Sequence, residues 1–233
     1  MIELTHVDFP FPSGQASKVQ PALAIRNNRL PNTGKVNKMS TAQKPTLSPE
    51  QYLDRERTAN YRSEYYRGEM FAMAGASWEH TLIKDNFARE TGNQLKYGPC
   101  RVVTSDLRVK VSVTGLYTYP DLTIVCDEPQ FEDVVMDTLL NPRIIVEVLS
   151  ESTEKYDRGT KFGHYRQISS VNEYLLVAQD RQLVEQYVRQ ADNAWVLKIF
   201  DQSNSIFKFA SISAQVALDE IYRGVEFPET PSR

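Results

Sequence analysis

The chain has 233 residues, of which 41% are apolar and 24% charged, and it carries a formal net charge of −3. That composition is typical of a soluble globular protein with a sizeable core, and the acidic balance argues against non-specific nucleic-acid binding through whole-molecule charge. The 2 cysteines and 3 histidines do not cluster, which argues against a structural zinc site, and no apolar run approaches membrane-spanning length.

The start of the chain lacks the basic-then-apolar layout of a secretory signal, so we expect a cytoplasmic protein. In that reducing compartment, Cys100 and Cys126 are interpreted as small buried apolar residues. A disulfide is open to them, but nothing in the pattern requires one.

Residues 1–45 differ from the rest, because half of the 12 prolines lie within the first 49 residues and no hydrophobic periodicity is sustained there. We predict that 1–45 is a disordered extension, 46–225 a folded domain and 226–233 a short tail.

Three elements are predicted at the start of the folded part. Ser48, Pro49 and Gln51 form a capping-box pattern at the start of a short helix that ends near residue 57. Two aromatic-rich runs over 62–73 are separated by Arg67-Gly68 and predict a β-hairpin. Ser77 is then placed to cap a helix over 78–96.

The middle of the chain predicts strands at 101–104, 107–113, 122–126, 144–149 and 173–178, with a helix over 153–168 before the last of them. The order strand, helix, strand is a βαβ unit, which implies parallel pairing. A meander follows, with turns at 180–181 and 192–193, and a helix around 214–222 closes the domain. The predicted fold class is therefore α/β.

Glu147 lies in a strand that is apolar on both sides of it, as in a strand buried on both faces. An unpaired carboxylate there would cost several kcal/mol, so a metal ion or a basic side chain must compensate it. Two interpretations stay open from the strand pattern alone: a metal site, or a buried ion pair with a nearby arginine such as Arg143.

Asp121 stands after Pro120 at the mouth of a second apolar strand. If this strand neighbours that of Glu147, the two carboxylates converge, and paired carboxylates suit Mg²⁺, which takes oxygen ligands. For Asp121 taken alone, a turn or capping role is the simpler interpretation. Asp157, Lys161 and Tyr165 share one helix face, where an exposed Asp-Lys pair is the simpler interpretation.

The order of these elements resembles the common core of the PD-(D/E)xK nuclease superfamily, and within it the Uma-two family, which is described as restriction-endonuclease-like. The resemblance covers about residues 46–225 and rests on the order and spacing of several short motifs. These are 61–69, Met73 with His80 shortly after, Tyr119-Pro120-Asp121, 145–153, the residues Asp157, Lys161 and Tyr165, and 171–177.

The resemblance implies a restriction-endonuclease-like mixed sheet flanked by helices, with added antiparallel hairpins. It implies that Asp121 and Glu147 are catalytic metal ligands and that Glu64 is a further carboxylate at the metal. One departure is that the superfamily's lysine would fall at Leu149, so Lys161 is expected to replace it. The remaining candidates for lining the site are His80, Asp106, Asp157 and Tyr165; for His80, a helix-surface or core position is the alternative.

The function implied is an Mg²⁺-dependent endonuclease acting on DNA, with Mn²⁺ as an alternative metal. Expected partners are DNA and a second copy of the chain, with no membrane. Basic residues that could contact the phosphate backbone are Arg62, Arg67, Arg101, Arg108, Arg158 and Arg166. Two other hypotheses stay open: a catalytically inert nuclease fold that binds nucleic acid or acts as a scaffold, and a hydrolase of small phosphate esters.

Overall fold

A computed structural model describes residues 46–227. The extension predicted over 1–45, and all but the first two residues of the predicted tail over 226–233, lie outside this range. No helix in the described range is long and apolar enough to cross a lipid bilayer.

Helices occupy a small part of the described chain, and the longest of them is α2. The helical elements are α1 (Pro49–Glu56), α2 (Trp78–Leu95), α3 (Glu154–Tyr156), the π-helical turn η1 (Asp157–Lys161), α4 (Phe162–Tyr165) and α5 (Leu218–Ile221).

The strands form three sheets, whose orders are β2-β1-β5-β4-β7, β11-β10-β9-β8-β6-β3 and β12-β13. In chain order the strands are β1 (Ser63–Tyr66), β2 (Glu69–Ala72), β3 (Cys100–Thr104), β4 (Arg108–Val111), β5 (Leu116–Thr118), β6 (Leu122–Cys126), β7 (Thr138–Leu139), β8 (Ile144–Val148), β9 (Glu173–Val177), β10 (Val184–Arg189), β11 (Trp195–Phe200), β12 (Ile206–Lys208) and β13 (Gln215–Ala217).

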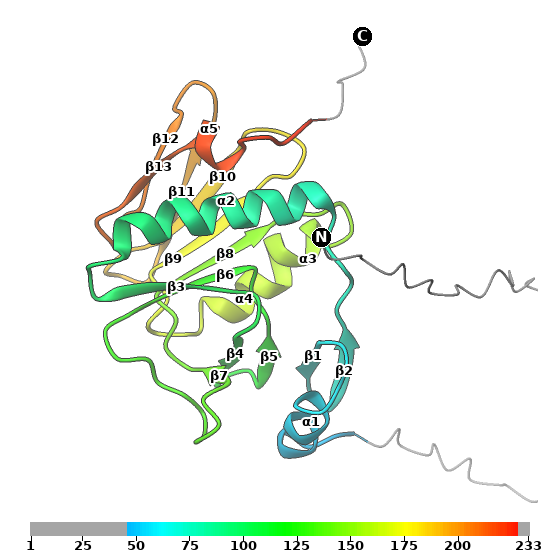
Figure 1. Cartoon of the computed structure of the whole chain (residues 1–233). Helices are drawn as coiled ribbons and strands as arrows, with labels where there is room; N and C mark the ends of the chain where they lie inside the picture. The colour runs from blue at the N-terminus through cyan, green and yellow to red at the C-terminus, as the bar shows by residue number, and fades with distance from the viewer. Residues whose placement is uncertain (1–45, 228–233) are drawn as a thin grey trace, which may run out of the picture. The chain divides into compact units, whose positions relative to one another are not determined.

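The six-stranded sheet is mixed, as the α/β prediction implied. β8 and β9 pair in parallel and are joined by the helical run α3-η1-α4, which confirms the predicted βαβ unit. β6 pairs with β8 in the antiparallel sense, so the strands of Asp121 and Glu147 are neighbours. Figure 1 shows α2 running across one face of this sheet and α4 on the other.

Alternate residues of the central strands enter two different hydrophobic cores, because successive side chains of a strand point to opposite faces. Ile144, Val146 and Val148 of β8 belong to the core that contains Ile83 and Phe87 of α2. The opposite face of β8, with Ile145 and Leu149, packs in a second core with Val109 and Val111 of β4, Tyr165 and Leu176. Glu147 has the parity of Ile145 and Leu149, so it points into this second layer.

Local sequence signals explain the first elements. Ser48 and Gln51 form the predicted capping box at the start of α1. The hairpin β1-β2 turns at Arg67 (φ 49°) and Gly68 (φ 86°), a turn with two positive φ angles that suits the twist of a hairpin. The Ser77 side chain accepts a hydrogen bond from the backbone N–H of His80 and caps α2 as predicted.

The structure corrects several boundaries. The short strands β5 and β7 were not predicted, because segments of three and two residues carry too little periodicity. The predicted strand over 107–113 is limited to Arg108–Val111, and the predicted helix over 214–222 begins as strand β13 and is helical only over Leu218–Ile221. The predicted helix over 153–168 is helical, but it contains the π-helical turn η1.

Cys100 and Cys126 form a disulfide, which corrects the interpretation of both as free thiols. They are 26 residues apart in sequence. They are nevertheless direct cross-strand partners, because β3 and β6 pair in the register Cys100↔Cys126. Their Cα atoms are 3.9 Å apart. This register depends on the pairing of β3 with β6 at the edge of the sheet, which no local sequence pattern predicts.

Candidate carboxylate and lysine site

Asp121 and Glu147 face each other across two neighbouring strands. β6 and β8 pair in the register Leu122↔Val146, and extending this antiparallel register by one residue places Asp121 opposite Glu147. The backbone N–H of Asp121 lies 3.4 Å from Glu147 Oε2, and the backbone N–H of Val148 donates to Asp121 Oδ2 at 2.8 Å. The pairing of two strands is therefore what brings these carboxylates together.

Glu147 is buried, with 3% of its surface exposed, and its charge is compensated by a lysine. Lys161 Nζ lies 2.9 Å from Glu147 Oε1, and the Tyr165 hydroxyl donates to the same oxygen at 2.8 Å. Within residues 46–227 no ion pair joins Glu147 to Arg143, so the arginine alternative considered from the sequence is wrong.

Lys161 is shared by three carboxylates. Its Nζ lies 3.4 Å from Glu64 Oε1 and 3.6 Å from Asp157 Oδ1, in addition to its contact with Glu147. Only 8% of the Lys161 side chain is exposed, so it does not form the exposed Asp-Lys pair of an ordinary helix surface. Lys161 ends the π-helical turn η1, and single π-turns inside helices are frequent at functional sites.

Burial and like charges raise the pKa of Glu147 well above its ordinary value. Desolvation is the largest cause, the carboxylates of Asp157 and Asp121 add to it, and Lys161 opposes it. Burial alone would lower the pKa of Lys161, but Glu147, Glu64 and Asp157 together raise it well above the usual range. Burial also raises the pKa of Asp157, against the effect of Lys161. In the site, three carboxyl groups therefore share the positive charge of one ammonium group.

Glu64 reaches this site from the other sheet. It lies on β1, and its Oε1 accepts a short hydrogen bond from the Thr118 hydroxyl of β5. The Tyr156 hydroxyl lies 3.4 Å from Glu64 Oε2. Thr118 and Tyr156 were missed by the sequence analysis. Thr118 lies on a strand too short to be predicted, whereas the position of Tyr156 next to Asp157 was a usable signal.

His80 contacts Asp121. Its Nε2 lies 3.0 Å from Asp121 Oδ1, and the ring is held by the first turn of α2, where Ser77 caps the backbone of the same residue. His80 is therefore neither a helix-surface residue nor a core residue, but a neighbour of the carboxylate pair.

Of the other residues predicted to line the site, some lie in it and some lie outside it. Tyr165 and Asp157 are in the site through Glu147 and Lys161. Asp106 is not: its side chain is largely exposed and pairs with Arg62. Leu149 is buried in the second core, so the place of the superfamily's lysine is filled by an apolar packing residue.

Four of the six basic residues suggested as phosphate contacts bind groups within the protein. Arg62 pairs with Asp106, and Arg101 donates to the backbone carbonyls of Gly98 and Cys100. Arg108 is buried and pairs with Asp137, and Arg158 pairs with both Glu154 and Glu185. Arg67 lies over the Tyr66 ring at 5.0 Å, on an exposed turn next to the site strand β1. Arg67 therefore remains a candidate for contact with an anionic ligand.

The donor set of the site fits a hard divalent cation. In the described part of the chain, no group of three or more His, Cys, Asp or Glu side chains is arranged to hold a metal ion. Mg²⁺, however, usually takes one or two carboxylates from a protein and keeps several waters. Glu147 Oε2, whose hydrogen bond from the Asp121 backbone is a long one of 3.4 Å, and the second lone pairs of the Asp121 carboxylate are available for this.

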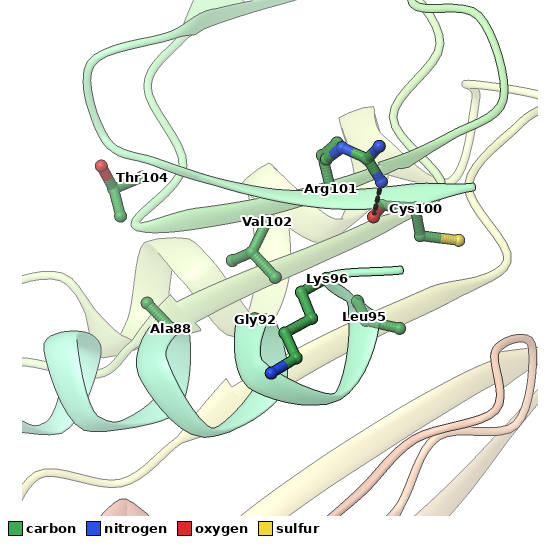
Figure 2. Close-up of a pocket in the computed structure, with 8 residues that line it drawn as sticks. All are labelled: Ala88, Gly92, Leu95, Lys96, Cys100, Arg101, Val102 and Thr104. Atoms are coloured by element: carbon green, nitrogen blue, oxygen red, sulfur yellow. Dashed lines mark hydrogen bonds between the residues drawn. The ribbon is translucent and has the colours of Figure 1, made fainter. Parts of the chain in front are cut away.

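Two cavities in the described structure lie away from the carboxylate pair. One of about 220 Å³ lies between α2 and β3 and is lined by Gly92, Lys96, Val102 and neighbouring residues, without an acid (Figure 2). A second of about 490 Å³ is lined by both cysteines, Arg143 and Asp127. Cys126 ends β6 at the end opposite Asp121, so neither cavity contains the carboxylate pair.

Comparison with known proteins gives consistent results. An uncharacterized protein of Synechocystis sp. PCC 6803, slr1290, is 36% identical over 183 residues, which are 78% of this chain and 95% of that protein. A second, sll1609, is 34% identical over 172 residues, 74% of this chain and 97% of that protein. A crystal structure described as a putative nuclease belonging to DUF820, from Anabaena variabilis, superposes with a TM-score of 0.61 at 16% identity.

That structural match covers 74% of this chain and 96% of the other chain, and it shows that the fold is shared. It confirms the predicted nuclease-like α/β architecture. Residues 49–218 match the model of the Uma2 (Uma-two) family, whose description is "Putative restriction endonuclease". The chain therefore belongs to the Uma2 family.

Proposed function

We propose that this protein is a metal-dependent endonuclease that acts on DNA. The observation that carries the proposal is the convergence of three carboxylates, Glu64, Glu147 and Asp157, on the single ammonium of Lys161, with Asp121 beside Glu147 on the neighbouring strand. In water-poor surroundings such an acid surplus is costly unless a further cation or a proton is bound. The family description and the nuclease named in the structural comparison indicate the substrate class.

Asp121 and Glu147 would hold the ion. Glu64 would add a further carboxylate, because its Oε1 lies near the same Lys161 ammonium as Glu147 Oε1. A bound Mg²⁺ or Mn²⁺ supplies an activated water and offsets the charge that develops on the phosphate. His80 fixes the orientation of the Asp121 carboxylate, and the buried Tyr165 hydroxyl fixes that of Glu147. Second partners of this kind position ligands and keep them ready for binding.

Lys161 supplies the positive charge that Leu149 cannot. Its ammonium already lies against Glu147, so a phosphate bound at the carboxylates would come within reach of it. Preorganised charge of this kind acts mainly where charge develops in the transition state. This placement weakens the hypothesis of an inert nuclease fold, which the apolar Leu149 had favoured.

A cleavage assay tests the proposal. The full chain would be incubated with supercoiled plasmid, linear duplex and single-stranded DNA, with Mg²⁺ or Mn²⁺ and with EDTA. Glu147→Ala should lose cleavage, whereas Glu151→Ala, an exposed glutamate on the same segment, should keep it. Absence of metal-dependent cleavage of every substrate would overturn the proposal. Hydrolysis of a small phosphodiester without any DNA binding would favour the small-ester hydrolase instead.

A further inference from the structure

An exposed aromatic ring stands next to the site on β2. β1 and β2 pair in the register Glu64↔Phe71, so these two side chains are direct neighbours on one face of the hairpin. Phe71 is 49% exposed. β2 ends its sheet, so the ring stands at an open edge beside the Glu64 carboxylate.

A second ring, that of Tyr156, contacts Glu64. Tyr156 of α3 points its hydroxyl at Glu64 Oε2, and Lys161 Nζ lies 6.0 Å from the centre of its ring. Tyr156 remains 36% exposed. The carboxylate and the ammonium of the site are therefore flanked by two rings that come from different parts of the chain.

The hairpin buries apolar side chains on one of its faces. The neighbouring pair, Tyr65 and Met70, faces inward and packs with Tyr52 and Tyr117 in a third core. The opposite face carries Glu64, which enters the site, Tyr66, which packs against the second core, and the exposed Phe71. The exposed Arg67 follows at the turn, over the Tyr66 ring. A phenylalanine on this charged face does not serve the packing of the hairpin, so a ligand is the better explanation.

The two rings favour a single-stranded nucleic acid over a duplex as the ligand. In a duplex the base faces are covered by their neighbours, whereas an unpaired base can stack on an aromatic side chain. A phosphate held at the carboxylates would place its adjoining base near Phe71 or Tyr156, and Arg67 could follow the backbone. We propose that the site takes unpaired DNA, with a base next to the scissile phosphate stacked on Phe71 and Tyr156. This inference rests on the proposed nuclease function.

Binding and cleavage of matched DNAs test the stacking. Affinity of the full chain for a single-stranded oligonucleotide and for a hairpin duplex of the same base composition would be measured by fluorescence anisotropy, without metal and with Mg²⁺. Phe71→Ala should weaken single-strand binding about tenfold and duplex binding far less. Phe71→Trp should restore the affinity, because a ring face is kept. Tyr97→Ala is the control, since Tyr97 is a 91% exposed ring beyond the end of α2.

A base analogue whose fluorescence falls on stacking, placed next to the cleaved bond, gives a second readout. Quenching by the wild type that is lost in Phe71→Ala supports the proposal. Equal cleavage of duplex and single strand, unchanged in Phe71→Ala, would overturn it while leaving the nuclease function intact. Loss of self-association in Phe71→Ala, with unchanged affinity for single strands, would also overturn it and identify the ring as a protein interface. Absence of any DNA cleavage by the wild type would instead overturn the nuclease function.

Discussion

Two of the clusters of buried or half-buried charge in the described domain are built on different principles. One is the site, where Glu64, Glu147 and Asp157 share Lys161. The other lies behind α1, where Arg57 binds Asp137 through two hydrogen bonds and Asp133 through a third. Both have acids and bases in contact, but they differ in how many acids each base serves.

In the cluster behind α1, two guanidinium groups serve the acids. Besides Arg57, the buried Arg108 lies 3.0 Å from Asp137 and donates to the Tyr119 hydroxyl at 2.7 Å. Tyr119 in turn donates to the buried Glu56 of α1 at 2.9 Å. Arginine suits this task because its planar fork can hold several oxygens at fixed angles. The result ties α1 to the loop before β7, although Oε2 of the buried Glu56 has no hydrogen-bond partner within the described residues.

At the site, a single flexible lysine faces the acids, and the strongest pKa shift of a carboxyl group there is upward, whereas that of Asp137 is downward. Desolvation is the largest cause at Glu147, and a hydrogen bond from Arg57 is the largest cause at Asp137. Paired acids therefore stabilise the fold in the cluster behind α1, whereas the acids of the site are held in an unfavourable state. The second condition is the one expected of a binding or catalytic site.

Removing the acids of the site gives the largest expected effect. Asp121→Asn combined with Glu147→Gln should lower DNA cleavage about 10³-fold or more, because several kcal/mol of charge stabilisation are lost. Added Mg²⁺ or Mn²⁺ should raise the thermal midpoint of the wild type and leave that of the double variant unchanged. Both quantities are measurable on one preparation, by cleavage assay and calorimetry. An equal metal response in the two proteins would show that the ion binds elsewhere.

The second effect concerns Lys161. Lys161→Met should lower turnover about 10²-fold while the affinity for uncleaved DNA changes little, because the charge acts chiefly in the transition state. Single-turnover kinetics together with binding titrations separate the two quantities. Lys155→Met, on the same helical run but exposed, is the control. A parallel loss of affinity and turnover would instead make Lys161 a general phosphate contact.

The third effect concerns a disulfide that lies outside both clusters. The Cys100–Cys126 disulfide closes a segment of 26 residues at the end of β6 that is remote from Asp121. Reduction should lower stability by about 2–3 kcal/mol through the loss of a constraint on the unfolded chain, with little change in cleavage rate. Denaturant unfolding with and without dithiothreitol measures this. The double variant Cys100→Ser/Cys126→Ser should not respond to the reductant.

The sequence indicated the local elements that carry the candidate site better than it indicated how the strands around them pair. The strands of Asp121 and Glu147 were evident from their apolar runs, and the helix carrying Asp157, Lys161 and Tyr165 from its spacing. What it could not give was the pairing of strands far apart in sequence. The β3–β6 register that joins the cysteines, and the β1–β5 pairing that brings Glu64 close to Thr118, are tertiary facts. Asp106 failed as a site residue because its acid character said nothing about its direction.

The smallest expected effect tests the cluster behind α1. The hydrogen bond from Arg57 lowers the pKa of Asp137 strongly, burial opposes this, and Arg108 adds to it. A carboxyl group whose pKa is depressed on folding contributes stability that is fully present above its unfolded pKa of about 4 and is lost as the pH falls towards the folded value. Asp137→Asn should therefore cost about 1 kcal/mol at pH 7, since the side chain is partly exposed and solvent screens the pair. The difference in unfolding free energy between variant and wild type should shrink below about pH 4.

Urea unfolding between pH 7 and pH 3 measures this difference, with the exposed Asp85→Asn as the matched control. Cleavage at neutral pH should stay near the wild-type rate, because Asp137 contacts Arg57, Arg108 and Thr138 and no residue of the carboxylate site. A pH-independent difference would show that Asp137 acts through packing rather than through its charge.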